Sequence, residues 1–205
     1  MYRIRSRLQR VSVEKLRPTQ MTVGLKEVER KRQAWARLGK KKRRAAMKEV
    51  FFPAVIGPRG AHYILDHHHM AVALAQEHAK HVQVGVVQDL STLDAGAFWI
   101  YLDHLSWVHP YDQHGRRRSF KDMPSSLHSL RDDPYRSLAG EVRDAGGFAK
   151  SDEPFLEFLW TNFFRDNVAV ELLKADYRKA LKKALRLALS AKAKHLPGWT
   201  GSGTG

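Results

Sequence analysis

The chain contains no cysteine. Disulfide bonds, cysteine-ligated zinc and thiol nucleophiles are therefore excluded. The absence of disulfide bonds fits a protein of the cytoplasm. Long apolar runs are also missing, since no stretch approaches the roughly 18 apolar residues that a membrane-spanning helix needs. The basic segment Met1–Leu8 continues into the polar pair Gln9-Arg10 and lacks the apolar core of a secretory signal. These absences predict a cytoplasmic protein that has no membrane partner.

Acidic residues are scarce relative to basic ones. The chain has 21 Asp and Glu against 36 Lys and Arg, a formal net charge of +15. An excess of this size attracts polyanions, so we expect a nucleotide or a nucleic acid as partner. The alternative is a solvated cationic face, which is what most charge runs are. The densest run is Lys40–Arg44, inside a segment 26–48 in which only Glu27 and Glu29 oppose the positive charge.

The first half of the chain alternates between strand and helix signals. The alternation over 10–16 predicts a strand that Pro18 ends, and 24–50 reads as a helix broken at Gly39. The apolar runs 52–56 and 62–65 flank a turn-forming Gly-Pro-Arg-Gly segment and predict a hairpin. A short apolar helix to about Ala79 and a strand over 81–87 complete a small sheet with helices, a mixed α+β fold.

The second half reads as helical. Helices are expected over 94–105, 135–144, 154–167 and 170–194, the last of them amphipathic and basic. We expect a single domain over 8–170, a C-terminal basic helix over 171–196 and a flexible tail over 197–205. The basic helix fits a face of its own core or a face of a partner equally well, so an oligomer is compatible with the sequence.

The run Asp66-His67-His68-His69 lies where a predicted strand ends and a predicted helix begins. The amide groups and the positive dipole end at the start of a helix favour a phosphate there. Imidazoles in this place can donate to phosphate oxygens, transfer a proton near neutral pH, or bind a metal together with Asp66. Three consecutive histidines cannot all face one point, so we expect two of them to act together. We expect Asp66 to cap the helix in either case, because Asp is a favoured N-cap residue. The structural alternative is that Asp66 does nothing else and that the histidines are surface polar residues.

A second group of candidate residues lies in the segment 103–118, which contains acidic, imidazole, aromatic and guanidinium groups next to Pro110 and Gly115. Loops of this kind often present binding residues. We single out His109, Asp112 and Arg116, the last as a bidentate ligand for phosphate. A solvated loop with its aromatic residues in the core is the alternative.

The blocks Val11–Gln20, Ile64–His69 and Trp107–Asp112 together resemble the ParB-like nuclease branch of the ParB/sulfiredoxin superfamily. The resemblance covers roughly residues 10–170, and the Asp-His-His block is its most specific part. It implies a compact fold with a strand-to-helix turn that binds nucleotide or substrate phosphates, usually with Mg²⁺. Carried over to this chain, His67, His68 and His69 fall on the phosphate-binding turn and Asp66 falls just before it.

Members of this superfamily differ in chemistry, so the resemblance leaves several activities open. The sulfiredoxin reaction is excluded because the chain has no cysteine. Serine-kinase relatives carry a glutamate base where this chain has Gln20, and an amide cannot accept a proton as a base at neutral pH. A kinase would need Glu27 or Glu29 in its place.

The sequence thus predicts a protein that binds a phosphate-bearing ligand and acts as a metal-assisted nuclease or nucleotide hydrolase. In this reading His67, His68 and Asp66 are catalytic, Asp66 is the metal ligand, and His67, His68, His69 and Arg116 bind phosphate. If His68 is catalytic, its replacement by Ala should lower turnover while leaving thermal stability nearly unchanged. A nucleotide-dependent amino-acid kinase and a non-catalytic nucleic-acid-binding module are the alternatives.

Overall fold

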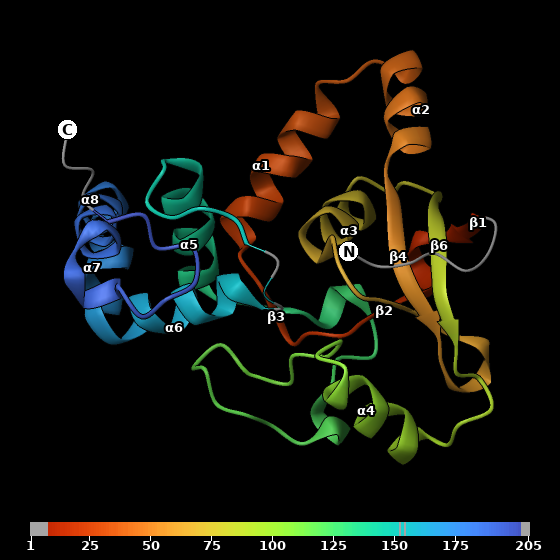
Figure 1. Cartoon of the computed structure of the whole chain (residues 1–205). Helices are drawn as coiled ribbons and strands as arrows, with labels where there is room; N and C mark the ends of the chain where they lie inside the picture. The colour runs from red at the N-terminus through yellow and green to blue at the C-terminus, as the bar shows by residue number, and fades with distance from the viewer. Residues whose placement is uncertain (1–7, 152, 154, 202–205) are drawn as a thin grey trace. The chain divides into compact units, whose positions relative to one another are not determined.

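The computed structural model describes residues 8–151, 153 and 155–201, without the side chain of Lys48. The chain forms two compact units, Met1–Asp132 and Asp133–Gly205, which Figure 1 shows coloured along the sequence. The division therefore falls before the helix that opens at Pro134, whereas the sequence placed it between 170 and 171. The reason is that the helices after Asp133 bury their apolar faces against one another and form their own core.

Unit 1 is built on a five-stranded mixed sheet. Its strand order is β1-β6-β4-β5-β2, with bounds β1 Gln9–Ser12, β2 Leu16–Pro18, β4 Phe51–Ile56, β5 His62–Ile64 and β6 His81–Asp89. β1 pairs antiparallel with β6, β6 runs parallel to β4, β4 pairs antiparallel with β5, and β5 runs parallel to β2. The predicted hairpin is the β4–β5 pair.

The single strand expected over 10–16 is wrong. It is two strands, separated by the 3₁₀ turn Val13–Lys15, and they lie at opposite edges of the sheet. Val11, Val13 and Leu16 are all buried, so the chain keeps its apolar side chains inside while it crosses the end of the sheet. The alternation of apolar and polar residues indicates which side chains are buried, but it does not indicate with which strand a segment pairs. The sequence therefore could not predict that the chain passes from one edge of the sheet to the other.

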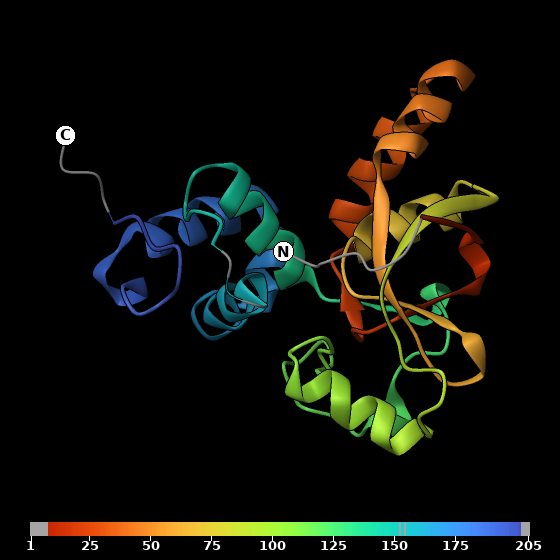
Figure 2. The ribbon, with the colours of Figure 1, turned by 45° about the vertical axis from the view of Figure 1, so that its right-hand side comes forward.

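Helices cover both faces of the sheet. α1 Leu25–Ala36 and α3 His68–Gln76 enclose one cluster with strand residues such as Phe52 and Ile64. α4 Ala95–His104 packs Phe98 and Leu102 into a second cluster with Val55, and Figure 2 shows it set apart from α1 and α3. Burial on both faces explains why β4 is apolar without alternation.

The helix expected over 24–50 divides at Gly39 into α1 and α2, as predicted. α2 spans Lys40–Glu49 and leads directly into β4. A two-stranded parallel sheet, β3 Thr22–Val23 with β7 Arg131–Asp132, holds the entrance of α1. Asp132 caps α1, because its Oδ1 accepts a hydrogen bond from the Leu25 amide at 2.9 Å.

Unit 2 is helical. It contains α5 Pro134–Asp144, α6 Leu156–Asn167, α7 Val170–Ala175 and α8 Tyr177–Leu189. The Phe148 and Trp160 rings stack with centroids 4.3 Å apart in its core, and the small buried face of α8 closes it with Ala180, Ala184 and Ala188.

The single helix expected over 170–194 is wrong, because α7 ends before Asp176. The Asp176 carboxylate accepts from the Lys179 amide and caps α8, so the chain restarts a helix there. Part of the segment expected to be a flexible tail is bound to the unit: Pro197 O accepts from Trp160 Nε1 at 2.9 Å and Gly198 O accepts from the Ala149 amide at 2.8 Å. Residues 202–205 lie outside the described residues.

Among the described residues, the helices are all too short or too polar to cross a membrane. The cytoplasmic location stays a prediction.

Gly57, at the end of β4, tests the packing between sheet and α4. A Cβ at this position would lie 2.6 Å from Tyr63 Cε2 and 2.8 Å from Phe98 Cε2. Because φ is −100°, a substitution meets only this steric conflict. Gly57→Ala should lower the free energy of unfolding by about 1–3 kcal/mol in urea titrations. Gly39→Ala, with nothing within 4 Å, is the control, and equal losses in the two variants would contradict the packing.

Candidate active site at the ends of β2 and β5

The two parallel strands β2 and β5 end side by side. Pro18 is in register with Ile64, so the residues that follow both strands emerge at one edge of the sheet. Thr19 and Gln20 follow β2. Asp66 and His67 follow β5 after the buried Leu65. Proline ends β2 without breaking the ladder because this is an edge strand, where a missing N–H donor is tolerated.

Thr19 is the residue that connects the parts of this edge. Its amide donates to His68 Nε2 at 3.1 Å, its Oγ1 donates to Ile64 O at 2.8 Å, and its carbonyl accepts from the His109 amide at 2.8 Å. The side chain is 2% exposed. One buried residue thus holds together the end of β5, the first turn of α3 and the loop at His109.

His68 and His69 point into the protein, with 5% and 8% of their surface exposed. His69 Nε2 accepts from the Gly24 amide at 3.0 Å, in the same manner as His68 accepts from Thr19. A ring nitrogen that accepts a hydrogen bond carries no proton, so both imidazoles are neutral with the proton on Nδ1. Glu27 Oε2 lies 3.6 Å from His69 Nε2, and this contact is no ion pair while the ring is neutral.

His67 and Asp66 point outward and are exposed. His67 has φ 64° and ψ 26°, a left-handed conformation that is unfavourable for a residue with a Cβ. Its ring lies edge-on to Phe52 with centroids 6.0 Å apart. Strained residues of this kind concentrate at functional sites.

The expected capping of α3 by Asp66 is wrong. The cap residue is His67, whose side chain makes no capping bond, and Asp66 Oδ1 accepts from the His67 amide at 2.6 Å. Asp66 stands one residue too early to reach the first turn, so its carboxylate fixes the left-handed residue instead.

The loop after α4 meets this edge through His109. Gln20 and His109 form a parallel bridge, and the His109 ring, 9% exposed, stacks on Tyr111 with centroids 4.5 Å apart. Gln20 Nε2 donates to Thr22 O at 2.7 Å, so this amide supports the turn after β2. The two segments singled out from the sequence are therefore neighbours through Thr19 and Gln20.

Asp112 organises the tip of this loop. Its Oδ1 accepts from the amides of His114 at 2.9 Å and Arg116 at 3.0 Å. Burial raises the pKa of the Asp112 carboxyl, but these hydrogen bonds and the positive charges of His114 and Arg118 outweigh burial and hold the pKa below its usual value. The Arg116 side chain is exposed and has no hydrogen bond or ion pair with the described part of the chain.

Two other acidic residues were candidates for a kinase base. Glu27 lies beside His69 and 3.3 Å from Lys31 Nζ. Glu29 is elsewhere on α1, where hydrogen bonds from Arg32 and Gln33 keep its pKa below the usual value. Of the two, only Glu27 is near the α3 turn.

No group of three or more His, Asp or Glu side chains suited to a metal ion occurs within residues 8–151, 153 and 155–201. Asp66 is nevertheless an exposed carboxylate at the mouth of the turn. Mg²⁺ commonly binds through one or two carboxylates together with substrate phosphates and water. The described residues therefore do not form a cage for a resident metal, and a single carboxylate at the turn is compatible only with an ion that the substrate itself helps to bind.

Sequence reasoning assigned no role to Thr19. A β-branched hydroxyl residue directly after a proline-terminated strand was the available signal, but it could not indicate that both backbone groups of Thr19 reach segments far along the chain.

A five-stranded mixed sheet with helices on both faces defines the class of the protein as mixed α+β. The chain belongs to the family described as "Putative ParB-like nuclease", whose model matches residues 9–166. It is similar to the crystal structure of protein Atu1540 from Agrobacterium tumefaciens, with 43% sequence identity and a TM-score of 0.89 over 96% of this chain and 100% of that chain. No curated protein matches the chain.

The position of His68 changes what its replacement should do. His68→Leu leaves the buried Thr19 amide without an acceptor, which should cost about 1–3 kcal/mol of unfolding free energy. The expectation of unchanged stability, made for His68→Ala from sequence, does not hold for a buried acceptor. His68→Gln offers an oxygen to the same amide and should recover part of the loss. Urea unfolding of both variants measures this, and equal stabilities for Leu and Gln would contradict the hydrogen bond.

Acid should weaken the loop at Asp112. A carboxyl whose pKa is lowered on folding adds stability above its unfolded pKa of about 3.9, and this contribution is lost as the pH falls through the folded pKa. Asp112→Asn keeps an accepting oxygen but loses the charge. The variant should be less stable than the parent at pH 7, and the gap should close towards pH 3. Unfolding titrations across this range test it, and a constant gap would contradict the charge effect.

Proposed function

We propose that the edge formed by Asp66, His67 and the loop His109–Arg116 binds a phosphate group of a nucleotide or a nucleic acid and hydrolyses its ester or anhydride bond. The observation that carries the proposal is the triple hydrogen bonding of Thr19, which fixes the exposed turn and the exposed loop relative to each other. Rigid placement of the groups that contact substrate is what lowers the entropic cost of reaction.

Each residue has a distinct proposed role. His67 donates to a phosphate oxygen or transfers a proton at its ring nitrogen, because it is the exposed imidazole of the three. His68 and His69 are positioning residues, since their Nε2 atoms hold Thr19 and Gly24. Arg116, which is exposed, neutralises phosphate charge.

Asp66 is the proposed contact for Mg²⁺. When bound, the ion would neutralise charge on the phosphate and favour attack by water. Oδ1 of Asp66 accepts from the His67 amide, so the carboxylate holds the turn, and Asp66 would hold the ion without giving up that hydrogen bond.

His67→Asn tests the proposal because asparagine tolerates the left-handed conformation. We expect hydrolysis of nucleoside triphosphates or DNA with Mg²⁺ to fall about 100-fold or more, with stability nearly unchanged. His78→Asn is a matched control, because His78 is an exposed left-handed histidine (φ 53°) just beyond the other end of α3. Asp66→Asn should raise the magnesium concentration needed for half-maximal rate.

Hydrolysis that survives in both His67→Asn and Asp66→Asn would overturn the assignment. The products separate the alternatives: release of inorganic phosphate or cleaved DNA supports hydrolysis. Transfer of the phosphate to a free hydroxyl amino acid would instead indicate a kinase, with Glu27 as the base near the turn.

A further inference from the structure

Two basic helices in unit 1 differ in how their charges are compensated. In α1, Lys31 is 3.3 Å from Glu27, and Arg32 pairs with Glu29 at 2.8 Å and Glu77 at 3.6 Å. In α1, therefore, at least these two cations have acidic partners on the same helix or on the neighbouring segment.

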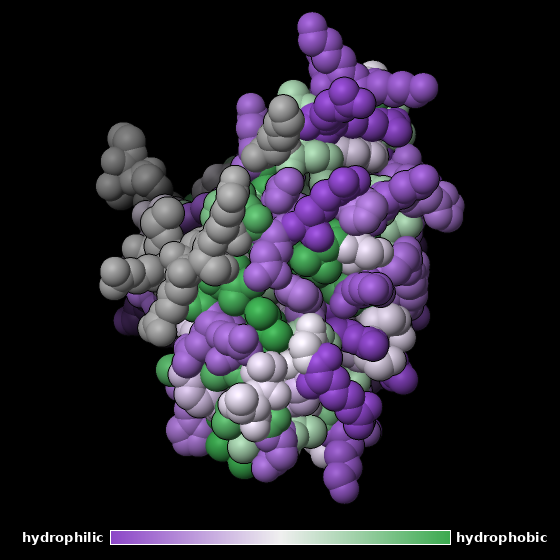
Figure 3. All heavy atoms as spheres, turned by 90° about the vertical axis from the view of Figure 1, so that its right-hand side faces the viewer, coloured by the Kyte–Doolittle hydropathy of each residue, from purple (hydrophilic) through white to green (hydrophobic). Residues whose placement is uncertain are grey.

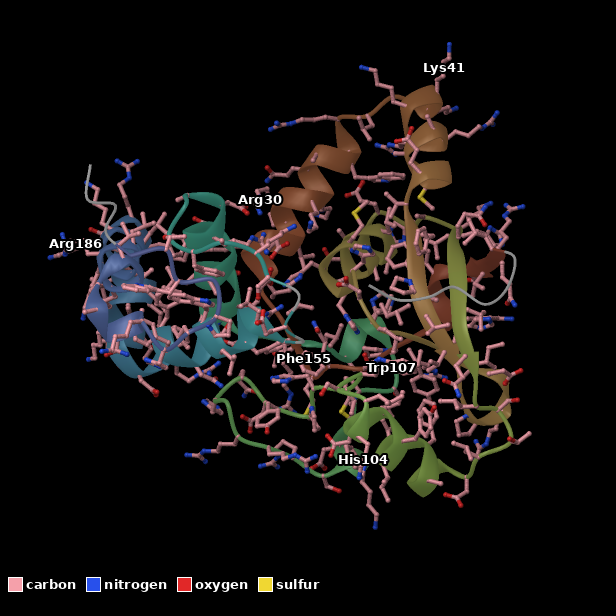
Figure 4. The ribbon with its side chains drawn as sticks, viewed as in Figure 1. Arg30, Lys41, His104, Trp107, Phe155 and Arg186 are labelled. Atoms are coloured by element: carbon pink, nitrogen blue, oxygen red, sulfur yellow. The ribbon has the colours of Figure 1, made fainter. Side chains whose placement is uncertain are left out.

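α2 has no such compensation. Six of its ten residues are Lys or Arg, and Glu49 at its end is the single acidic residue. Arg43 folds back on α1, where it donates to the Trp35 and Ala36 carbonyls at 3.1 and 2.8 Å and lies over the Trp35 ring. The other cations of the first turns are exposed and form no ion pair with the described acidic residues: Lys40, Lys41, Lys42 and Arg44. Figure 4 shows Lys41 projecting away from the ribbon.

The placement of these charges opposes the stability of the helix itself. The start of a helix carries positive partial charge, so cations are favourable at the other end. The first turn of α2 contains Lys40, Lys41 and Lys42 and no acidic residue. An anion bound at this end of α2 would offset the repulsion.

A hollow of about 380 Å³ lies between α2 and the β1–β6 edge of the sheet, and it is lined with further cations. Arg44 and Met47 come from α2, Arg10 from β1, His81 from the start of β6, and Lys80 from the residue just before it. Arg10 Nη2 is 3.1 Å from His81 Nδ1, which orients the guanidinium. Figure 3 shows hydrophilic side chains gathered at the top of this face, over α2.

We propose that α2 and this hollow form a docking surface for the sugar–phosphate backbone of a nucleic acid. It is called here the α2 basic surface and consists of Lys40, Lys41, Lys42, Arg44, Arg10 and Lys80. A helix of ten residues is about 15 Å long, so it presents charges over a longer span than a single nucleotide fills. A polymer with a phosphate at each step matches such a row.

An anionic membrane is the weaker match. Membrane-surface helices combine a cationic face with large apolar side chains that enter the lipid. The apolar residues of α2 are Ala45, Ala46 and Met47, and Met47 is half-buried against the core. The proposed contacts are to phosphates, which are the same at every step of the polymer, so the binding is expected to be independent of base sequence.

The surface is connected to the candidate active site by the chain itself. α2 leads into β4, and Phe52 of β4 packs against the His67 ring. A bound polynucleotide would therefore be held by the same unit that carries the β5–α3 turn. Docking does not depend on hydrolysis there.

The test replaces Lys40, Lys41, Lys42 and Arg44 together with Gln, which keeps helix propensity and removes four charges. Binding of a random-sequence DNA duplex is measured without magnesium at several salt concentrations. We expect at least tenfold weaker binding at low salt. We also expect the slope of the logarithm of the association constant against the logarithm of the salt concentration to be smaller in magnitude by about 3. Arg10→Gln with Lys80→Gln should weaken binding further in the same direction.

The matched control removes four exposed cations from α8, Arg178, Lys179, Lys182 and Arg186, also to Gln. Circular dichroism and melting confirm that each variant is folded. An unchanged salt slope in the α2 variant, or an equal loss in the α8 variant, would overturn the proposal. The proposal would also be overturned if the α2 variant lost binding to phosphatidylglycerol vesicles but still bound DNA as the parent does. Mononucleotide binding that persists in the α2 variant, together with lost DNA binding, would support a surface separate from the turn.

Discussion

Two neutral imidazoles hold the centre of unit 1 together. His68 and His69, adjacent in the first turn of α3, accept hydrogen bonds from the amides of Thr19 and Gly24, which are the exit of β2 and the entrance of α1. These amides are buried, so each would cost free energy without an acceptor. Together with the β3–β7 pair and the Asp132 cap, these two bonds tie the segment between β2 and α1 to the first turn of α3.

Because of these two hydrogen bonds, the three consecutive histidines have different roles: two support the fold and one faces solvent. The helical turn directs His68 and His69 inward, and the left-handed residue before the helix directs His67 outward. Asp66 stabilises that conformation through the His67 amide and remains exposed. The turn can therefore offer an imidazole and a carboxylate to a ligand without loosening the core, because the groups that carry the fold are different from those that face solvent.

The same separation applies to the positive charge. Arg43 donates hydrogen bonds to carbonyls of α1, and Lys31 and Arg32 form ion pairs with carboxylates. Four cations of α2 lack acidic partners among the described residues: Lys40, Lys41, Lys42 and Arg44. Net charge alone could not distinguish these groups. The membership of the ParB-like nuclease family and the similarity to the Agrobacterium structure describe a shared architecture. Fold and chemistry are separable, so in our proposals the ligand is decided by the turn and by the α2 basic surface and not by the shared architecture.

Local patterns in the sequence were sufficient for the β4–β5 hairpin, the break at Gly39, the strand-to-helix turn at Asp66 and the family, because apolar periodicity, turn residues and a short motif act over a few neighbouring positions. The sequence did not predict that a new helix begins after Asp176, because the apolar periodicity continues through this capping residue. It also did not predict the division of the chain after Asp132, because a second core is decided by packing. Tertiary structure alone placed β1 and β2 at opposite edges and brought Thr19 to His68 and His109. Such contacts join residues 49 and about 90 positions apart, and their energy comes from satisfying buried backbone groups, for which the sequence contains no periodic signal.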